Sequence, residues 1–271
     1  MSIAVVALGM CAITLGAGPK EAAGAEADEP PQAALPRDVH SYGNPHQVRV
    51  RHVALDLAVD FDKKQLAGTA TLSVVRAPGA PADAPLVLDS RALTIEAVEA
   101  GRSGEGWKPV SFERGTSDRI LGTPLSLLLP PGADQVKIRY RTSPEATALQ
   151  WLEPSQTAGG KHPFLYTQSE AIHARSWIPL QDSPSVRVTY EARIQVPAPL
   201  SAQMSARLEQ GTAPGQFRFT MSHPIPSYLI ALAAGDLESR PLGPRTVVVA
   251  EPPVVEKAAW EFADTERMVA S

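Results

Sequence analysis

Residues 186–196 read VRVTYEARIQV, and apolar and polar side chains alternate at every position of this segment. In a β-strand successive side chains point to opposite faces, so an alternation of this kind places all the apolar groups on one face. A strand that is buried on one face and solvated on the other is typical of an antiparallel sheet. The segment therefore predicts a half-buried antiparallel strand and an all-β fold.

The same period of two appears in other parts of the chain. Alternating or short apolar runs predict further strands over 53–61, 66–74, 86–88, 93–98, 125–129 and 136–140, and another that begins at Phe217 and Phe219. The run 228–234 is apolar without interruption, which is typical of a strand covered on both faces. Residues 62–64 predict a hairpin turn, and Pro130-Pro131-Gly132 predicts a tight connection.

The two ends of the chain differ from this β-rich middle. Residues 3–17 are nearly all apolar, too few to span a membrane but suited to a signal peptide. We therefore expect a signal peptide candidate at 1–18, a flexible linker at 19–37, and an exported protein, periplasmic or secreted. The alternative is a buried or disordered N-terminal segment. Met10 is too large to precede a lipidated Cys11, so a lipoprotein is not expected.

At the other end, good helix formers follow Pro253, and Val255, Ala259, Phe262 and Val269 lie near one face of the expected helix. No glycine caps this helix before Ser271, and its apolar face has little to pack against. We therefore expect the natural protein to be longer.

Composition and motifs exclude several classes of function. The 271 residues carry a net charge of -4, which gives no electrostatic case for nucleic acid. Only one cysteine is present, and none of the six histidines lies in an H-E-x-x-H motif. No G-x-S-x-G elbow or glycine-rich phosphate loop occurs, and no stretch predicts an integral membrane span. We therefore assign no catalytic residue and no metal ligand to this chain.

Polar, aromatic and ionisable residues are concentrated in residues 148–175, between two strand-rich regions. Loops of this composition on a rigid β scaffold often line binding sites. The other interpretation is a solvated loop with a few capping hydrogen bonds, and composition alone favours it.

This segment also carries a resemblance to a known family. Seven motifs resemble the N-terminal domain of the zinc aminopeptidase family of leukotriene A4 hydrolase and its bacterial aminopeptidase N relatives: 150–152, 160–163, 167–175 (TQSEAIHAR), 181–186 (QDSPSV), 225–232 (IPSYLIAL), 235–240 (GDLESR) and 243–246 (GPRT). The resemblance implies a saddle-like, mostly antiparallel multi-sheet β domain over 38–244. Residues 245–271 would then be the truncated strand-helix start of a thermolysin-like catalytic domain. In this family zinc, the general-base glutamate and the Gly-x-Met-Glu-Asn motif belong to that second domain, so the resemblance places zinc in the full-length parent.

The resemblance also implies three substrate-binding residues, Gln168, Glu170 and Ala171, on a loop that reaches the active-site cleft. Glu170 would hold the free α-amine of the substrate, and Gln168 would shape the pocket for the first side chain. Leukotriene A4 hydrolase has Gln at the position of Glu170, so the glutamate favours a plain aminopeptidase and puts epoxide hydrolase activity in doubt.

Two neighbouring pairs are expected to have structural roles. His173 and Arg175 would brace the loop or the domain interface, and Gln181 and Asp182 would make hydrogen bonds within a turn.

Our leading hypothesis is therefore a fragment of a zinc metallo-aminopeptidase, inactive by itself, that supplies the amine anchor and one wall of the cleft. Its partners would be the N-terminus of a peptide substrate and the missing catalytic domain. The alternative is a complete non-catalytic peptide-binding or scaffolding β module. A sugar-binding β-sandwich would explain the strands but not the ordered motifs.

Overall fold

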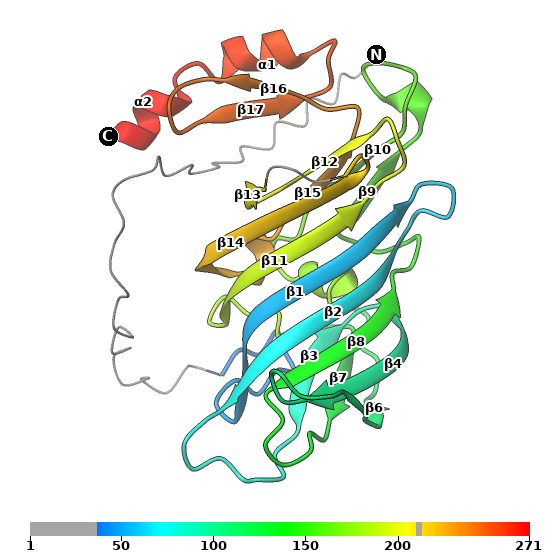
Figure 1. The fold of residues 1–271 in the computed structure, drawn as a ribbon, viewed down its shortest axis with the longest axis vertical. Helices are drawn as coiled ribbons and strands as arrows, with labels where there is room; N and C mark the ends of the chain where they lie inside the picture. Colours follow the sequence, from blue (N-terminus) through cyan, green and yellow to red (C-terminus); the bar gives the residue numbers. More distant parts are fainter. Residues whose placement is uncertain (1–36, 210–212) are drawn as a thin grey trace.

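The computed structural model describes residues 37–209 and 213–271. The signal peptide candidate at 1–18, and the linker up to residue 36, lie outside the described residues. The described part is built from four sheets and two short α-helices, which confirms the expected all-β, mostly antiparallel fold (Figure 1). Within these residues no helix is long and apolar enough to cross a membrane.

The largest element is an eight-stranded sheet that forms a broad twisted surface (Figure 1). Its strands, in the order in which they lie side by side, are β13 (Arg207–Leu208), β14 (Gln216–Pro226), β11 (Arg187–Gln195), β1 (Val48–Asp60), β2 (Gln65–Arg76), β8 (Gln135–Arg141), β4 (Thr94–Gly101) and β5 (Lys108–Pro109). On β1, β2 and β11 alternate side chains are buried, as the period of two predicts.

One part of the strand prediction was incomplete. β11 is half-buried as expected and runs antiparallel to β14, but it runs parallel to its other neighbour, β1. Alternation in sequence reports which face of a strand is buried, because it depends on the side chains alone. It carries no information on the direction of the neighbouring strand, so the parallel pair could not be foreseen.

Two smaller sheets contribute buried side chains to the same hydrophobic core as the large sheet. The first contains β12 (Ser201–Met204), β15 (Leu232–Gly235), β10 (Phe164–Thr167) and β9 (Leu149–Leu152); the second contains β3 (Leu86–Ser90), β7 (Thr123–Leu127) and β6 (Phe112–Arg114). The core between them includes Trp177, which is fully buried and whose carbonyl accepts a hydrogen bond of 2.9 Å from the Tyr140 hydroxyl on β8.

Between the sheets, the described part of the chain forms three short 3₁₀ turns: η1 (Pro154–Gln156), η2 (Ala174–Ser176) and η3 (Ser227–Leu229). The continuous strand predicted over 228–234 was therefore half wrong, because η3 replaces its first part and only its last residues belong to a strand, β15. The hydrogen bond from Ile230 N to Ser227 O, 3.0 Å long, closes this turn. Ile230 is fully buried, so its apolar character reflects burial and not membership of a strand.

The C-terminal residues form a small unit with β16 (Glu238–Pro241), β17 (Val247–Ala250), α1 (Val255–Glu261) and α2 (Thr265–Ala270). The single helix expected after Pro253 is thus two helices, and Asp264 and Thr265, both poor residues for a helix interior, stand at the break. The proposed boundary at 244/245 falls between β16 and β17, which pair with each other. That boundary stays a prediction.

Close packing of β1 against β2 depends on a glycine. Gly68 lies opposite Leu57 in the register of this pair and has a φ of +153°, which side chains rarely adopt. A Cβ at this position would lie 1.9 Å from the carbonyl oxygen of Asp56, far inside van der Waals contact. The central pair of the large sheet therefore tolerates no side chain here.

We expect Gly68→Ala to lower the free energy of unfolding by about 3 kcal/mol, because the backbone of β1 or β2 must move to admit the methyl group. Urea denaturation of the two proteins measures this difference. Gly106→Ala is the matched control, since a Cβ at Gly106 would meet nothing within 4 Å. Equal denaturation midpoints for Gly68→Ala and Gly106→Ala would contradict the prediction.

Candidate functional site

The loop between β10 and η2 carries the three residues that the family resemblance implied for substrate binding. Along this loop the side chains alternate in direction. Thr167 and Ser169 are buried, whereas Gln168, Glu170 and Ala171 are exposed. The peptide bond between Glu170 and Ala171 is cis. The structure thus brings the three residues together on one exposed turn, which we call the Glu170 loop (residues 168–173).

The inward side chains of this segment hold the backbone in place. Ser169 Oγ accepts a hydrogen bond of 3.1 Å from Trp177 Nε1 and donates one of 3.2 Å to Ile230 O. Thr167 Oγ1 accepts a bond of 2.9 Å from Leu232 N at the start of β15. Because these bonds are buried, they are shielded from competition with water. The exposed side chains therefore project from a backbone that is held in place by the buried hydrogen bonds of Thr167 and Ser169.

The second half of the loop is braced in a similar way. His173 Nδ1 and Thr147 Oγ1 lie 2.8 Å apart, within hydrogen-bond distance. Ser176 Oγ donates a bond of 2.8 Å to His173 O and accepts one of 3.0 Å from Ala148 N. These contacts join the loop to the segment that leads into β9. His173 therefore braces the loop, in agreement with the role expected for it.

Beneath the loop lies Arg175, whose side chain is completely buried. Its Nε donates to Asp182 Oδ2 at 3.0 Å, and its Nη2 donates to Asp182 O at 3.0 Å and to His40 O at 2.8 Å. Its Nη1 donates to Leu121 O at 2.8 Å. One guanidinium group therefore joins η2 to the nearby Asp182 and to two segments that are distant in sequence, at His40 and Leu121.

A second carboxylate completes this buried cluster. Asp89 Oδ1 lies 3.6 Å from Arg175 Nη1, and the carboxylate accepts hydrogen bonds from Ser41 Oγ (2.6 Å), Tyr42 N (2.7 Å) and Asp182 N (2.8 Å). Burial raises the pKa of the Asp89 carboxyl, and the charge of Arg175 and the three donors act in the opposite direction. Buried charges are tolerated when they are paired and fully hydrogen-bonded, as they are here.

The expectation for Gln181 and Asp182 was incomplete. Gln181 O accepts a hydrogen bond of 3.1 Å from Ser183 N within a turn, but the side chains of both residues bond to other parts of the fold. Gln181 Nε2 donates to Val48 O at 2.8 Å and its Oε1 accepts from Val50 N at 3.1 Å, both on β1. Asp182 Oδ1 accepts from Ser227 Oγ at 2.5 Å, in addition to its bonds with Arg175. Partners this far apart in sequence leave no local pattern by which they could be found.

Exposed apolar side chains flank the cluster, and sequence reasoning missed them. Val39 is 72% exposed, Ile120 57% and Leu229 47%. Val39 and Ile120 adjoin the two residues whose carbonyls accept from Arg175, and Leu229 belongs to η3 together with Ser227. Exposed apolar side chains therefore stand next to residues that belong to, or are bonded to, the Arg175 cluster.

A metal site is not formed by the described residues. Within 37–209 and 213–271 no group of three or more His, Cys, Asp or Glu side chains is placed so that it could hold a metal ion. The residues present therefore do not fit a zinc ion, and no metal-dependent step is assigned to them.

Comparison with known proteins gives a consistent result. Residues 46–229 match the family model of the Peptidase M1 N-terminal domain. Leukotriene A-4 hydrolase from Xenopus laevis is 40% identical over 244 residues, which cover 86% of this chain and 39% of that protein. Leucine aminopeptidase 2 from Yarrowia lipolytica is 40% identical over 239 residues, which cover 86% of this chain and 35% of that protein.

Solved structures show the same relationship. Leukotriene A4 hydrolase from Saccharomyces cerevisiae superposes with a TM-score of 0.79 at 34% identity, over 89% of this chain and 37% of that one. An M1 zinc metallopeptidase from Deinococcus radiodurans superposes with a TM-score of 0.56 at 25% identity, over 76% of this chain and 47% of that one. The chain therefore spans less than half the length of each of these relatives.

We expect Arg175→Lys to lower the free energy of unfolding by about 3 kcal/mol, because an ammonium group cannot reproduce the fork of donors that joins Asp182, Leu121 and His40. Urea denaturation measures the change. The matched control is Arg139→Lys, an exposed arginine on β8, for which we expect a change within about 0.5 kcal/mol. Similar small changes in both variants would show that the cluster is not a principal source of stability.

Proposed function

This chain belongs to the Peptidase M1 N-terminal domain family, and from this premise we propose that it forms one wall of the substrate cleft of a zinc aminopeptidase. In this proposal the Glu170 loop anchors the free N-terminus of a peptide. A catalytic domain in the same polypeptide carries zinc and performs the hydrolysis. Removal of one residue at a time follows from the anchor, because only a chain end offers the ammonium group.

The observation that carries the proposal is the exposed position of Glu170 on a backbone held by buried hydrogen bonds. A carboxylate is a strong hydrogen-bond partner for an ammonium group, since both carry charge. A rigid support matters because a site that is already in its binding geometry loses little entropy when the ligand arrives. Ser169 supplies that support from directly beside Glu170.

Gln168 and Ala171 are assigned to the surroundings of the amine. Gln168 Oε1 accepts a hydrogen bond of 3.3 Å from the Glu170 backbone N–H, so the two residues are linked within the loop. The Gln168 amide remains available to line the pocket for the first side chain. Ala171 adds only a methyl group, which leaves room for the ligand beside the carboxylate.

The cleft needs a second wall to bind strongly. An ion pair exposed to water contributes at most about 1 kcal/mol, whereas exclusion of water strengthens the same pair several-fold. Val39, Ile120 and Leu229 are exposed apolar side chains on segments bonded to the Arg175 cluster, and we assign them to the surface that packs against another domain. The catalytic domain is the partner that we propose for this surface.

We expect leucinamide, which carries a free α-amine and no carboxylate, to perturb the amide NMR resonances of residues 168–173 with a dissociation constant on the order of 10 mM. Glu170→Gln removes the charge at nearly constant shape and should weaken this binding about fivefold or more. Glu261→Gln, an exposed carboxylate on α1, is the matched control and should leave it unchanged.

Two further ligands separate the alternatives. N-acetylleucinamide lacks the amine and should leave these resonances unmoved. If Glu170→Gln binds leucinamide as well as the unsubstituted chain does, the amine anchor is wrong. If a peptide blocked at its N-terminus binds instead, the domain acts as a peptide-binding or scaffolding module.

We also expect the purified chain to bind no stoichiometric zinc and to release no product from leucine p-nitroanilide. The reason is that neither H-E-x-x-H nor Gly-x-Met-Glu-Asn occurs in its 271 residues. Elemental analysis after dialysis and a chromogenic assay test this. Zinc-dependent turnover that persists through repurification would require a metal site in this chain and would overturn the assignment of chemistry to another domain.

A further inference from the structure

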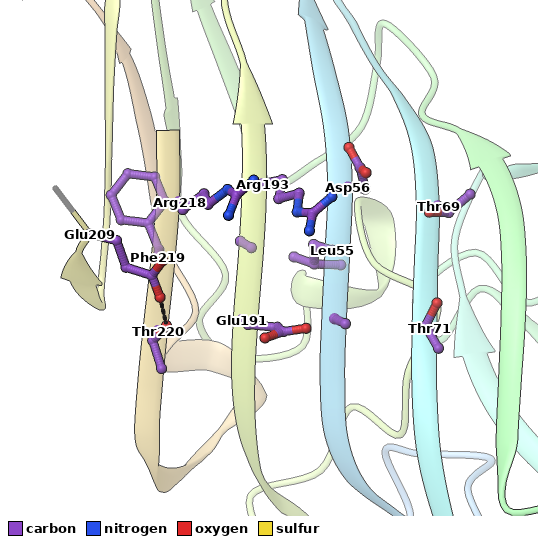
Figure 2. Close-up of a pocket in the computed structure, with 12 residues that line it drawn as sticks. Leu55, Asp56, Thr69, Thr71, Glu191, Arg193, Glu209, Arg218, Phe219 and Thr220 are labelled. Carbon is purple, nitrogen blue, oxygen red and sulfur yellow. Dashed lines mark hydrogen bonds between the residues drawn. The ribbon is translucent and has the colours of Figure 1, made fainter. Parts of the chain in front are cut away.

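The outward face of the eight-stranded sheet carries a shallow depression of about 260 Å³ (Figure 2). Residues of β2, β1, β11 and β14 line it, together with Glu209, which follows β13. The buried side chains of these strands point to the other face, where the smaller sheets and the Glu170 loop lie. The depression is therefore separate from the site described above.

Strand register places charged side chains in one row across this face. Arg218 on β14 lies opposite Arg193 on β11, and Arg193 lies beside Asp56 on β1. The row continues through Thr69 on β2 to Arg139 on β8. Like charges directly opposite each other on neighbouring strands are destabilising. The pair of arginines therefore has an electrostatic cost, which a carboxylate group placed between them would reduce.

Neither arginine is neutralised by a carboxylate of the described residues. Arg193 and Arg218 form no ion pair within the described part of the chain, although Asp56 is the direct neighbour of Arg193. Figure 2 shows the Arg193 side chain reaching from β11 toward β1, with Asp56 on one side and Glu191 on the other. Both guanidinium groups keep donors free for a ligand.

The negative groups of the depression are close to the positive ones. Glu191 lies two residues from Arg193 on the same face of β11, a separation of about 7 Å along a strand. Asp56 is one strand away, and neither carboxylate forms an ion pair within the described residues. The third carboxylate, Glu209, accepts a hydrogen bond of 2.6 Å from Thr220 Oγ1. The depression therefore offers unpaired charges of both signs.

We propose that this depression binds a free α-amino acid in its zwitterionic form. The α-carboxylate accepts hydrogen bonds from Arg193 and Arg218, and the α-ammonium group donates to Glu191 and Asp56. A simple anion would be repelled by the two carboxylates, and a simple cation by the two arginines. Only a ligand that carries both charges a few ångströms apart matches the layout.

Space for the side chain of the ligand comes from the neighbouring row. Ala54 on β1 lies between Glu191 and Thr71 in register, so a methyl group separates longer polar side chains on either side. On the side of the depression formed by β2, the hydroxyl groups of Thr69 and Thr71 offer further polar groups to the ligand. Because the site is open to water, we expect a dissociation constant on the order of 1–10 mM.

The test is an NMR titration of the Glu170→Gln chain, in which the other proposed amine site is disabled. Leucine should shift the amide resonances of β1, β11 and β14. Leucinamide, which lacks the carboxylate, and N-acetylleucine, which lacks the ammonium group, should each bind at least about tenfold more weakly. Inorganic phosphate should also bind more weakly than leucine, because it carries only negative charge.

Substitutions identify the residues. Arg193→Gln and Arg218→Gln should each weaken leucine binding about fivefold or more, and Glu191→Gln should do so as well. Arg139→Gln is the matched control, an exposed arginine in the same row three strands from Arg193, and should have no effect. All of these side chains are exposed, so thermal melts should stay within about 1 °C of the parent.

Three outcomes would overturn the proposal. The first is that leucine shifts no amide resonance at concentrations up to about 20 mM. The second is that the Arg193→Gln chain binds leucine as tightly as the chain without this substitution. The third is that N-acetylleucine or phosphate binds as tightly as leucine, which would indicate a site for anions only. The two proposed sites lie on opposite sides of the sheet and report through different resonances. Failure at the Glu170 loop would therefore leave this site standing, and the reverse is also true.

Discussion

The fold depends on one buried cation. Arg175 donates hydrogen bonds to Asp182, to the carbonyl of Leu121 and to the carbonyl of His40, and Asp89 balances its charge from the end of β3. Burying charges carries a large desolvation cost, which is recovered only when every donor and acceptor finds a partner. The geometry of the cluster is therefore set collectively, because a shift in any one segment would leave a charged group unsatisfied in the core.

The position of the Glu170 loop is set by its connections to this cluster. Arg175 lies in η2, immediately after the loop, and Trp177 in the next turn donates to Ser169 Oγ within it. Asp182 in turn binds the Ser227 hydroxyl of η3, and Ile230 beyond η3 accepts from Ser169 Oγ. Buried hydrogen bonds thus connect Ser169 of the loop both to η2 and to the segment of η3. Exposed residues can be placed accurately by a loop only when its base is as rigid as this one.

Features of the fold and of the site that depend on consecutive residues could be predicted from the sequence, whereas features that depend on residues far apart in sequence could not. The alternation in 186–196 gave the faces of β11 correctly, because face is a property of consecutive residues. The parallel neighbour of β11, the 3₁₀ turn at Ser227–Leu229 and the long-range partners of Gln181 and Asp182 were not predictable, since each depends on segments brought together by folding. The likeness of 167–175 to a known family singled out the exposed turn, but the apolar flank at Val39, Ile120 and Leu229 left no local signal.

The alternating directions of the side chains along the Glu170 loop have an evolutionary consequence. Thr167 and Ser169 face inward and belong to the fold, whereas the side chains of Gln168 and Glu170 are exposed. Mutations at the outward positions can therefore change what the domain recognises without changing whether it folds. Substitutions at these two positions are therefore less limited by the stability threshold than most, so proteins that share this scaffold can diversify in ligand preference while the buried Ser169 between them serves the fold.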